Sequence, residues 1–103
     1  MIIREWRARA SRSNPNAYPA HFHGTVLPEL RHIPGFLGAD LAARPTGETM
    51  EFLVLTRWQS IEAIRGFAGD NVSHAIVEPG AVAALVEFDP IARHYDVIED
   101  VSA

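Results

Sequence analysis

The segment between residues 50 and 58 places the strongest constraint on the fold. In an extended chain successive side chains point to opposite faces, and here both faces are largely apolar. One face carries Phe52, Val54, Thr56 and Trp58, and the other carries Glu51, Leu53, Leu55 and Arg57. A strand that is apolar on both faces needs cover on both. We therefore expect Met50 to Trp58 to form a strand in a sheet that is covered on its two sides.

Turn-forming residues divide the rest of the chain into a regular succession of elements. Strands are predicted over residues 2 to 9, 36 to 44, 50 to 58 and 92 to 99, and helices between residues 16 and 33 and over residues 61 to 68. Ser60 is expected to cap the second helix. Residues 74 to 88 indicate irregular or short helical structure, which Pro79-Gly80 should interrupt.

The first helix has one apolar face, because four large residues recur every four positions. These residues are Tyr18, Phe22, Val26 and Leu30. Asn14 or Asn16 is expected to cap this helix. Pro28 should kink it, since the proline ring meets the carbonyl group of Gly24.

The order of elements, β-α-β-β-α-β, is that of the ferredoxin-like split βαβ arrangement. The sequence thus predicts one α+β domain over residues 1–103 with a single antiparallel sheet. Both crossovers are right-handed, so both helices cover the same face. A second copy of the chain is the simplest cover for the other face, which predicts a homodimer through Leu53 and Leu55, or through Phe52 and Val54 if that face points outward. The alternative is a single covered sheet whose second set of apolar residues is there by chance.

Composition excludes several classes of function. The formal net charge is −4, which argues against a nucleic-acid partner because such proteins favour a basic stripe. No cysteine is present, so disulfides and thiolate chemistry are excluded. No apolar run approaches the roughly 18 residues of a membrane span, and the first residues do not resemble a signal peptide. We expect a cytoplasmic protein without a membrane partner.

Residues 54–60 (VLTRWQS) and 61–67 (IEAIRGF) together resemble the antibiotic biosynthesis monooxygenase family. Members of this family carry a strand that ends in Trp-x-Ser and runs into a helix with Glu-Ala near its start. Pro34-Gly35-Phe36 and residues 94–97 (HYDV) fit as well. The resemblance implies a dimeric α/β barrel, in which two such sheets face each other, with a cavity between each sheet and its helices.

The same resemblance implies a range of activities. Family members include cofactor-free oxygenases of phenolic polycyclic aromatics, quinol monooxygenases and haem-degrading enzymes. The haem-degrading branch has an asparagine in the first strand, a tryptophan in the second helix and a haem-ligating histidine a few residues beyond. Here the first strand has no asparagine, the helix position carries Phe67, and His74 falls a few residues early. We therefore expect no haem and no other bound cofactor.

Two histidines are candidates for a catalytic base. His74 follows the second helix, where it would rim the cavity, and an imidazole there could take a proton from a phenol or an anthrone. The alternative is an ordinary loop histidine. His94 lies two residues from Asp96 on a strand, so the two side chains share a face. The alternative for this pair is a set of charges that protects an edge strand from aggregation.

Aromatic, arginine and further histidine residues are candidates for lining a pocket, stabilising an anion or binding a metal. Five aromatic residues could line an apolar pocket for a flat ligand, or could simply form the core. They are Trp6, Tyr18, Phe22, Trp58 and Phe67. Arg4 or Arg57, if turned into the cavity, could stabilise an anion, although either could also form a salt bridge at the dimer rim. His21 and His23 are two residues apart on a helix and therefore point to nearly opposite sides, so we expect no metal site.

These observations favour a cofactor-independent monooxygenase that acts on a small phenolic or quinol-type aromatic. The enzyme would deprotonate its substrate, and the electron-rich anion would react with dioxygen. The alternative is a non-catalytic dimeric module that binds a small hydrophobic ligand. A polar, titratable group that points into the cavity would favour the enzyme.

Overall fold

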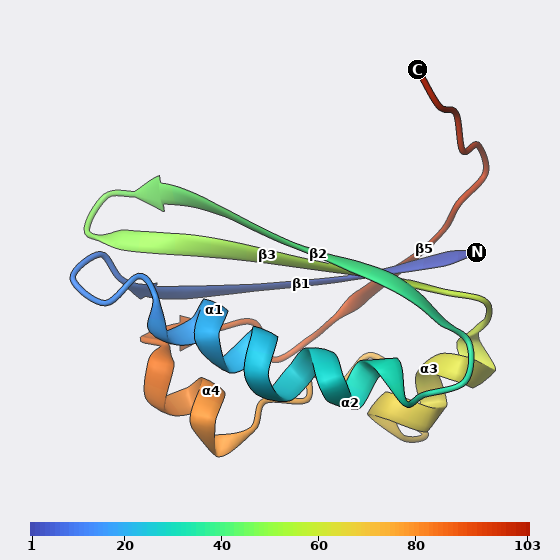
Figure 1. Cartoon of the computed structure of the whole chain (residues 1–103), viewed down its shortest axis with the longest axis horizontal. Coiled ribbons are helices and arrows are strands. Elements are labelled where there is room, and N and C mark those ends of the chain that lie inside the picture. Colours follow the sequence, from blue (N-terminus) through green and yellow to red (C-terminus); the bar gives the residue numbers. More distant parts are fainter.

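A computed structural model describes residues 1–103 as a single antiparallel sheet with its helices on one face (Figure 1). The strands are β1 (Ile2–Ser11), β2 (Phe36–Thr46), β3 (Thr49–Trp58), β4 (Glu87–Phe88) and β5 (Arg93–Asp96). The helical segments are α1 (Ala17–His21), η1 (Phe22–Val26), α2 (Leu27–Arg31), α3 (Ile61–Ala68) and α4 (Pro79–Ala84). The strands lie in the order β2-β3-β1-β4, and β5 also pairs with β1. The predicted α+β, ferredoxin-like fold is confirmed.

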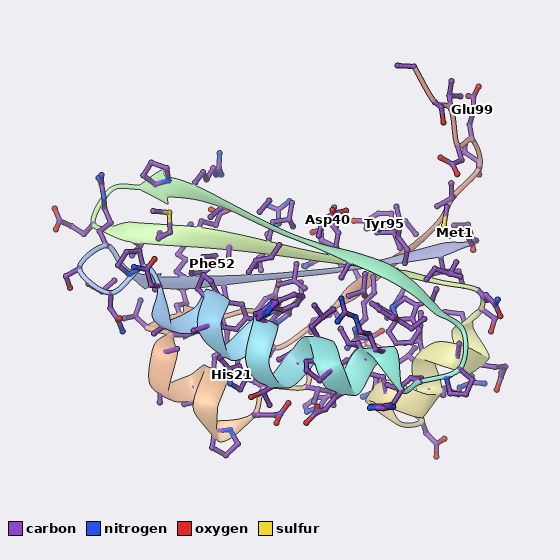
Figure 2. The ribbon with its side chains drawn as sticks, viewed as in Figure 1. Met1, His21, Asp40, Phe52, Tyr95 and Glu99 are labelled. Atoms are coloured by element: carbon purple, nitrogen blue, oxygen red, sulfur yellow. The ribbon has the colours of Figure 1, made fainter.

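Strand β3 lies inside the sheet, between β1 and β2, and its two faces meet different surroundings. Phe52, Val54 and Trp58 are buried beneath the helices. Leu53 and Leu55, on the other face, are only half-buried. Figure 2 shows Asp40 and Tyr95 on this second face and His21 on the helical side. The sheet does not close on itself, and one chain leaves this face, here called the open face, without a covering layer.

The first helix is continuous but contains a wider turn ahead of Pro28. Segments α1, η1 and α2 follow one another without a gap, and η1 is a π-helix. The N–H of Leu27 donates to the carbonyl of Phe22, five residues back. Because Pro28 has no N–H and its ring would crowd the preceding turn, a π-helical turn relieves the conflict that a regular α-helix would suffer. Asn16 occupies the N-cap position, but its side chain makes no capping hydrogen bond.

The corner between β3 and α3 is built as the sequence predicts. Ser60 caps α3, and its Oγ accepts a hydrogen bond from the N–H of Ala63 at 3.2 Å. Gly35, with φ of 92°, packs against Ala63, where a Cβ atom would lie 2.5 Å from the Cβ of Ala63. Only glycine suits this position, because it combines a positive φ with a close approach.

The C-terminal third differs from prediction in three respects. Pro79-Gly80 does not interrupt a helix but begins α4, with Pro79 in the first turn, where its missing N–H costs nothing. The short strand β4 was not predicted. The last strand is shorter than expected, and β4 and β5 both pair with β1. Beyond β5 the chain leaves the body of the molecule on the side away from the helices (Figure 1).

Two hydrophobic clusters fill the space between the sheet and the helices. The first centres on Tyr18, Phe22 and Phe52, and the second on Trp58 and Ile64 with Leu30. The expected apolar face of the first helix thus contributes to both clusters. None of the helices is long and apolar enough to cross a membrane.

Candidate functional site

A cavity of about 50 Å³ lies between the sheet and the helices, where the two hydrophobic clusters meet. Nine of its thirteen lining residues are hydrophobic. Polar groups reach it from different elements: Arg4, Thr56, Tyr18, His21 and Glu78. An apolar cavity with a few convergent polar groups is the usual form of a small-molecule site.

The predicted aromatic residues divide between the cavity and the core. Trp6, Tyr18 and Phe67 line the cavity. Phe22 and Trp58 do not line it and are buried within the two clusters.

Two of these aromatic residues are held by specific contacts. The indole N–H of Trp6 donates to the carbonyl of Asp89 at 2.6 Å, which fixes its ring against the last part of the chain. Trp58 stacks on Phe67 with ring centroids 6.1 Å apart, and its indole N–H donates to Thr56 Oγ1 at 2.8 Å. Trp58 therefore does not contact the cavity but supports the Phe67 ring that lines it.

Arg4 is a buried cation without a carboxylate partner. Its side chain is 5% exposed and extends from β1 beneath the helices. The guanidinium donates to the carbonyl of Val72, to the carbonyl of His74 at 3.0 Å and to His94 Nε2 at 2.8 Å. Burial lowers the pKa of Arg4 to about 10, which still leaves it charged at neutral pH. A positive charge that is shielded from solvent in an apolar cavity favours the binding of an anion.

Arg57, the other arginine considered for this role, points to the open face. It pairs there with Asp40, and both side chains are partly exposed. Arg57 therefore contributes nothing to the cavity in a single chain.

The two histidines predicted as bases do not line the cavity. The side chain of His74 is exposed, and the residue contributes its backbone carbonyl, which orients Arg4. His94 is on the helical side of the sheet and half-buried, with Nε2 engaged by Arg4. Burial, and then the charge of Arg4, lower the pKa of His94. Asp96 is exposed and makes no hydrogen bond to His94. The catalytic role of either histidine stays a prediction.

His21 and Glu78 line the cavity instead. From the sequence His21 is a candidate only for metal binding, and Glu78 is not a candidate site residue. His21 follows Tyr18 by three residues, the spacing that places two side chains on one helical face. Their ring centroids lie 6.2 Å apart. Glu78 arrives from the segment before α4. His23 is exposed, and no group of three or more potential metal ligands is assembled anywhere in the chain.

Comparison with solved structures gives several full-length matches at low sequence identity. A protein from Bacillus cereus assigned to the antibiotic biosynthesis monooxygenases matches with a TM-score of 0.71 at 18% identity, covering 100% of this chain and 96% of the other. The monooxygenase from the gene ActVA-Orf6 of Streptomyces coelicolor, in complex with the ligand nanaomycin D, matches with a TM-score of 0.68 at 17% identity, covering 99% and 91%. The haem-degrader MhuD from Mycobacterium tuberculosis, with two haems bound in its active site, matches with a TM-score of 0.62 at 19% identity, covering 99% and 100%.

The sequence itself identifies the family more directly. None of the curated proteins matches the chain significantly. The model of the antibiotic biosynthesis monooxygenase family, however, matches residues 1–79, which include β1 to β3, the helices between them and Glu78. The chain therefore belongs to the antibiotic biosynthesis monooxygenase family.

Proposed function

We propose that the protein is a cofactor-independent monooxygenase that oxidises a small phenolic or quinol-type aromatic with dioxygen. Family membership supports monooxygenase-type chemistry. The observation that carries the finer proposal is the apolar cavity into which a buried, carboxylate-free Arg4 projects together with Tyr18, His21 and Glu78. The apolar lining can hold an aromatic ring, and Arg4 can hold the negative charge that forms on it.

The reaction needs an electron-rich anion and no redox group from the protein. A base removes the proton of the substrate hydroxyl, and the resulting anion donates electrons to dioxygen. One oxygen atom stays on the carbon that is attacked, and the other leaves as water with two hydrogen atoms of the substrate. The substrate thus gains one oxygen atom and loses two hydrogen atoms, and dioxygen accepts all four electrons.

Arg4 is suited to stabilise the anion during this reaction. Of its five N–H groups, three donate to Val72, His74 and His94, which leaves two for a ligand. The three protein acceptors fix the guanidinium in place, so little reorganisation accompanies the appearance of charge. His74 and His94, candidates for the base from the sequence, hold Arg4 in place, His74 through its backbone carbonyl and His94 through Nε2.

The size of the cavity bears on how a substrate enters. A volume of about 50 Å³ is well below the roughly 300–1,000 Å³ of typical ligand pockets. Residues 75–81 form one wall through Ala75, Ile76, Glu78 and Ala81. The segment makes no backbone hydrogen bond to a strand from residue 76 to residue 85, and its outward movement would admit an aromatic system of one or two rings. Such a lid would also exclude water once it closed.

The proposal includes a homodimer that forms through the open face. Leu53 and Leu55 lie at its centre, and Ile98, in the segment that follows β5, is 96% exposed. A second copy would cover these residues and bury more than about 1,000 Å² in total. Sedimentation velocity at micromolar concentration should give a dimer, and a monomer would refute this part. Leu55→Asp should yield unfolded or aggregated protein, whereas Val82→Asp, on the exposed side of α4, should leave the dimer intact.

Oxygen consumption tests the activity. The purified protein is mixed with 1,4-naphthohydroquinone or anthrone, with a metal chelator present, and dioxygen uptake is followed with an electrode. Uptake above the spontaneous rate, together with a product that carries one more oxygen atom, is the expected result. Tight binding of these aromatics without any acceleration would instead favour a non-catalytic module for a hydrophobic ligand.

A further inference from the structure

His21 stands out among the polar residues of the cavity because one of its nitrogens is buried without a partner. Its ring lies on the helical side of the sheet, toward α4 (Figure 2). The Nε2 atom is buried and makes no hydrogen bond, and it is the only side-chain nitrogen of the chain in that state. Buried polar atoms are nearly always paired, so an exception needs an explanation. A ligand hydroxyl in the cavity would supply the missing partner.

The neighbouring chain is shaped to receive this ring. Gly80, in the first turn of α4, lies against it, and a Cβ atom there would come within 2.8 Å of His21 Nδ1. The absence of a side chain at Gly80 leaves room for the imidazole to pack against α4, and Nε2 stays unpaired. This is the arrangement that a positioned proton acceptor requires.

Titratable groups from three elements surround His21. Tyr18 lies on the same helix, Glu29 comes from α2, and Glu78 comes from the segment before α4. Burial, and then the nearby carboxylate of Glu78, raise the pKa of Glu29, and the charge of His21 acts in the opposite direction. Two carboxylates that repel each other gain when a positive charge forms beside them. Glu29 and Glu78 therefore place negative charge close to the His21 ring.

We propose that His21 is the catalytic base of this protein, and that its Nε2 accepts the proton of the phenolic hydroxyl of the substrate. The O–H bond of the substrate breaks, an N–H bond forms on the imidazole, and the electron pair stays on the phenolate oxygen. Glu29 and Glu78 stabilise the imidazolium, and Arg4 on the sheet side of the cavity stabilises the negative charge of the ring. The inference rests on the proposed function for the phenolic nature of the ligand.

Neither of the two other candidate histidines offers an unpaired ring nitrogen to the cavity. His74 is exposed, and His94 already accepts a hydrogen bond from Arg4 through Nε2. His23, two residues from His21 in the adjoining segment η1, is exposed and serves as a matched control.

A phenol whose ionisation is visible tests the inference without any turnover. The probe is 4-nitrophenol, which is yellow as the phenolate, at a pH below the pKa of the free phenol. The full-length protein and its His21→Leu and His23→Leu variants are titrated, and circular dichroism verifies that each is folded. We expect the bound probe to show the phenolate band in the wild type and in His23→Leu. In His21→Leu the band should be absent and the affinity should fall about tenfold or more. His21→Gln, which keeps a polar side chain of similar size, provides a second variant should His21→Leu fail to fold.

The outcomes separate the inference from the proposed function. A wild type that does not bind the probe, or that binds it without the phenolate band, overturns the role of His21. An equal phenolate band in the folded His21 variant overturns it as well, since Arg4 alone would then suffice. Failure to consume dioxygen with 1,4-naphthohydroquinone, despite the phenolate band in the wild type and its loss in the variant, refutes the oxygenase and leaves the proton acceptor established.

Discussion

Replacement of His21 by leucine should make the protein more stable while it removes the function. A buried nitrogen without a hydrogen bond costs about 1–3 kcal/mol, and His21 Nε2 is such an atom. Leucine has a similar volume, carries no polar atom and adds apolar contact with Val26 and Ala81, which line the same cavity. Loss of the favourable interaction between His21 and Glu29 opposes this gain, but Glu29 lies at the surface, where such interactions are weak.

The net gain should be about 1–2 kcal/mol in the free energy of unfolding, a rise in Tm of roughly 5–10 °C for a domain of this size. Urea titration measures it as a higher midpoint with an unchanged slope. Protein concentration must be equal in all samples, because a dimer gains stability by mass action. His23→Leu is the control, and since His23 is exposed its effect should stay within about 0.5 kcal/mol.

A clear loss of stability in His21→Leu would contradict the view that Nε2 is an unpaired buried atom. It would mean that Nε2 has a structural partner, such as a bound water or a carboxylate, and that the histidine serves the fold. A gain in stability together with loss of phenol binding is the signature of a residue kept for function at a cost to stability.

Three further predictions concern the surroundings of the site. The pKa of His94 lies below its ordinary value of 6.5 because of burial and the charge of Arg4. Below pH 6.5 His94 therefore binds a proton more readily in the unfolded chain than in the folded chain. The free energy of unfolding should fall as the pH drops, and it should fall less steeply in His94→Gln. Gly35→Ala combines a positive φ with a clash against Ala63 and should destabilise the protein by about 2–4 kcal/mol, measured by urea titration. Haem, which MhuD binds, should give no sharp Soret band at one equivalent; a sharp band that disappears in His74→Ala would contradict this.

The fold could be predicted because its signals are local. The alternation of β3 and the four-residue repeat of the first helix each depend on a few consecutive residues, and both elements form where expected. The strand β4 could not be predicted, because it is two exposed residues long and exists only through its pairing with β1. The start of α4 differs from the prediction because Pro-Gly is typical of a helix end, whereas proline is also favoured in a first helical turn, which is where Pro79 lies.

The site was harder to predict than the fold because its parts come from distant segments. Three of the predicted aromatic residues, Trp6, Tyr18 and Phe67, line the cavity. Large aromatic side chains on the inward-facing side of a strand or helix must pack between the sheet and the helices. The two-residue spacing of His21 from His23 argues against a metal site, but its three-residue spacing from Tyr18 is the signal that places it at the cavity. Glu78 lies in a segment without periodicity, so nothing in the sequence could orient it toward residues some fifty or more positions earlier.

Labelled dioxygen shows whether the cavity carries out an oxygenation. The protein reacts with 1,4-naphthohydroquinone under isotopically labelled dioxygen, and the product is identified by mass spectrometry beside the His21→Leu and His23→Leu variants. We expect a hydroxylated quinone that carries one labelled oxygen atom. The wild type and His23→Leu should form it at similar rates, and His21→Leu about 10²–10⁴-fold more slowly. Unlabelled product, or a product formed no faster than without the protein, would contradict the claim that this cavity is the site of an oxygenase.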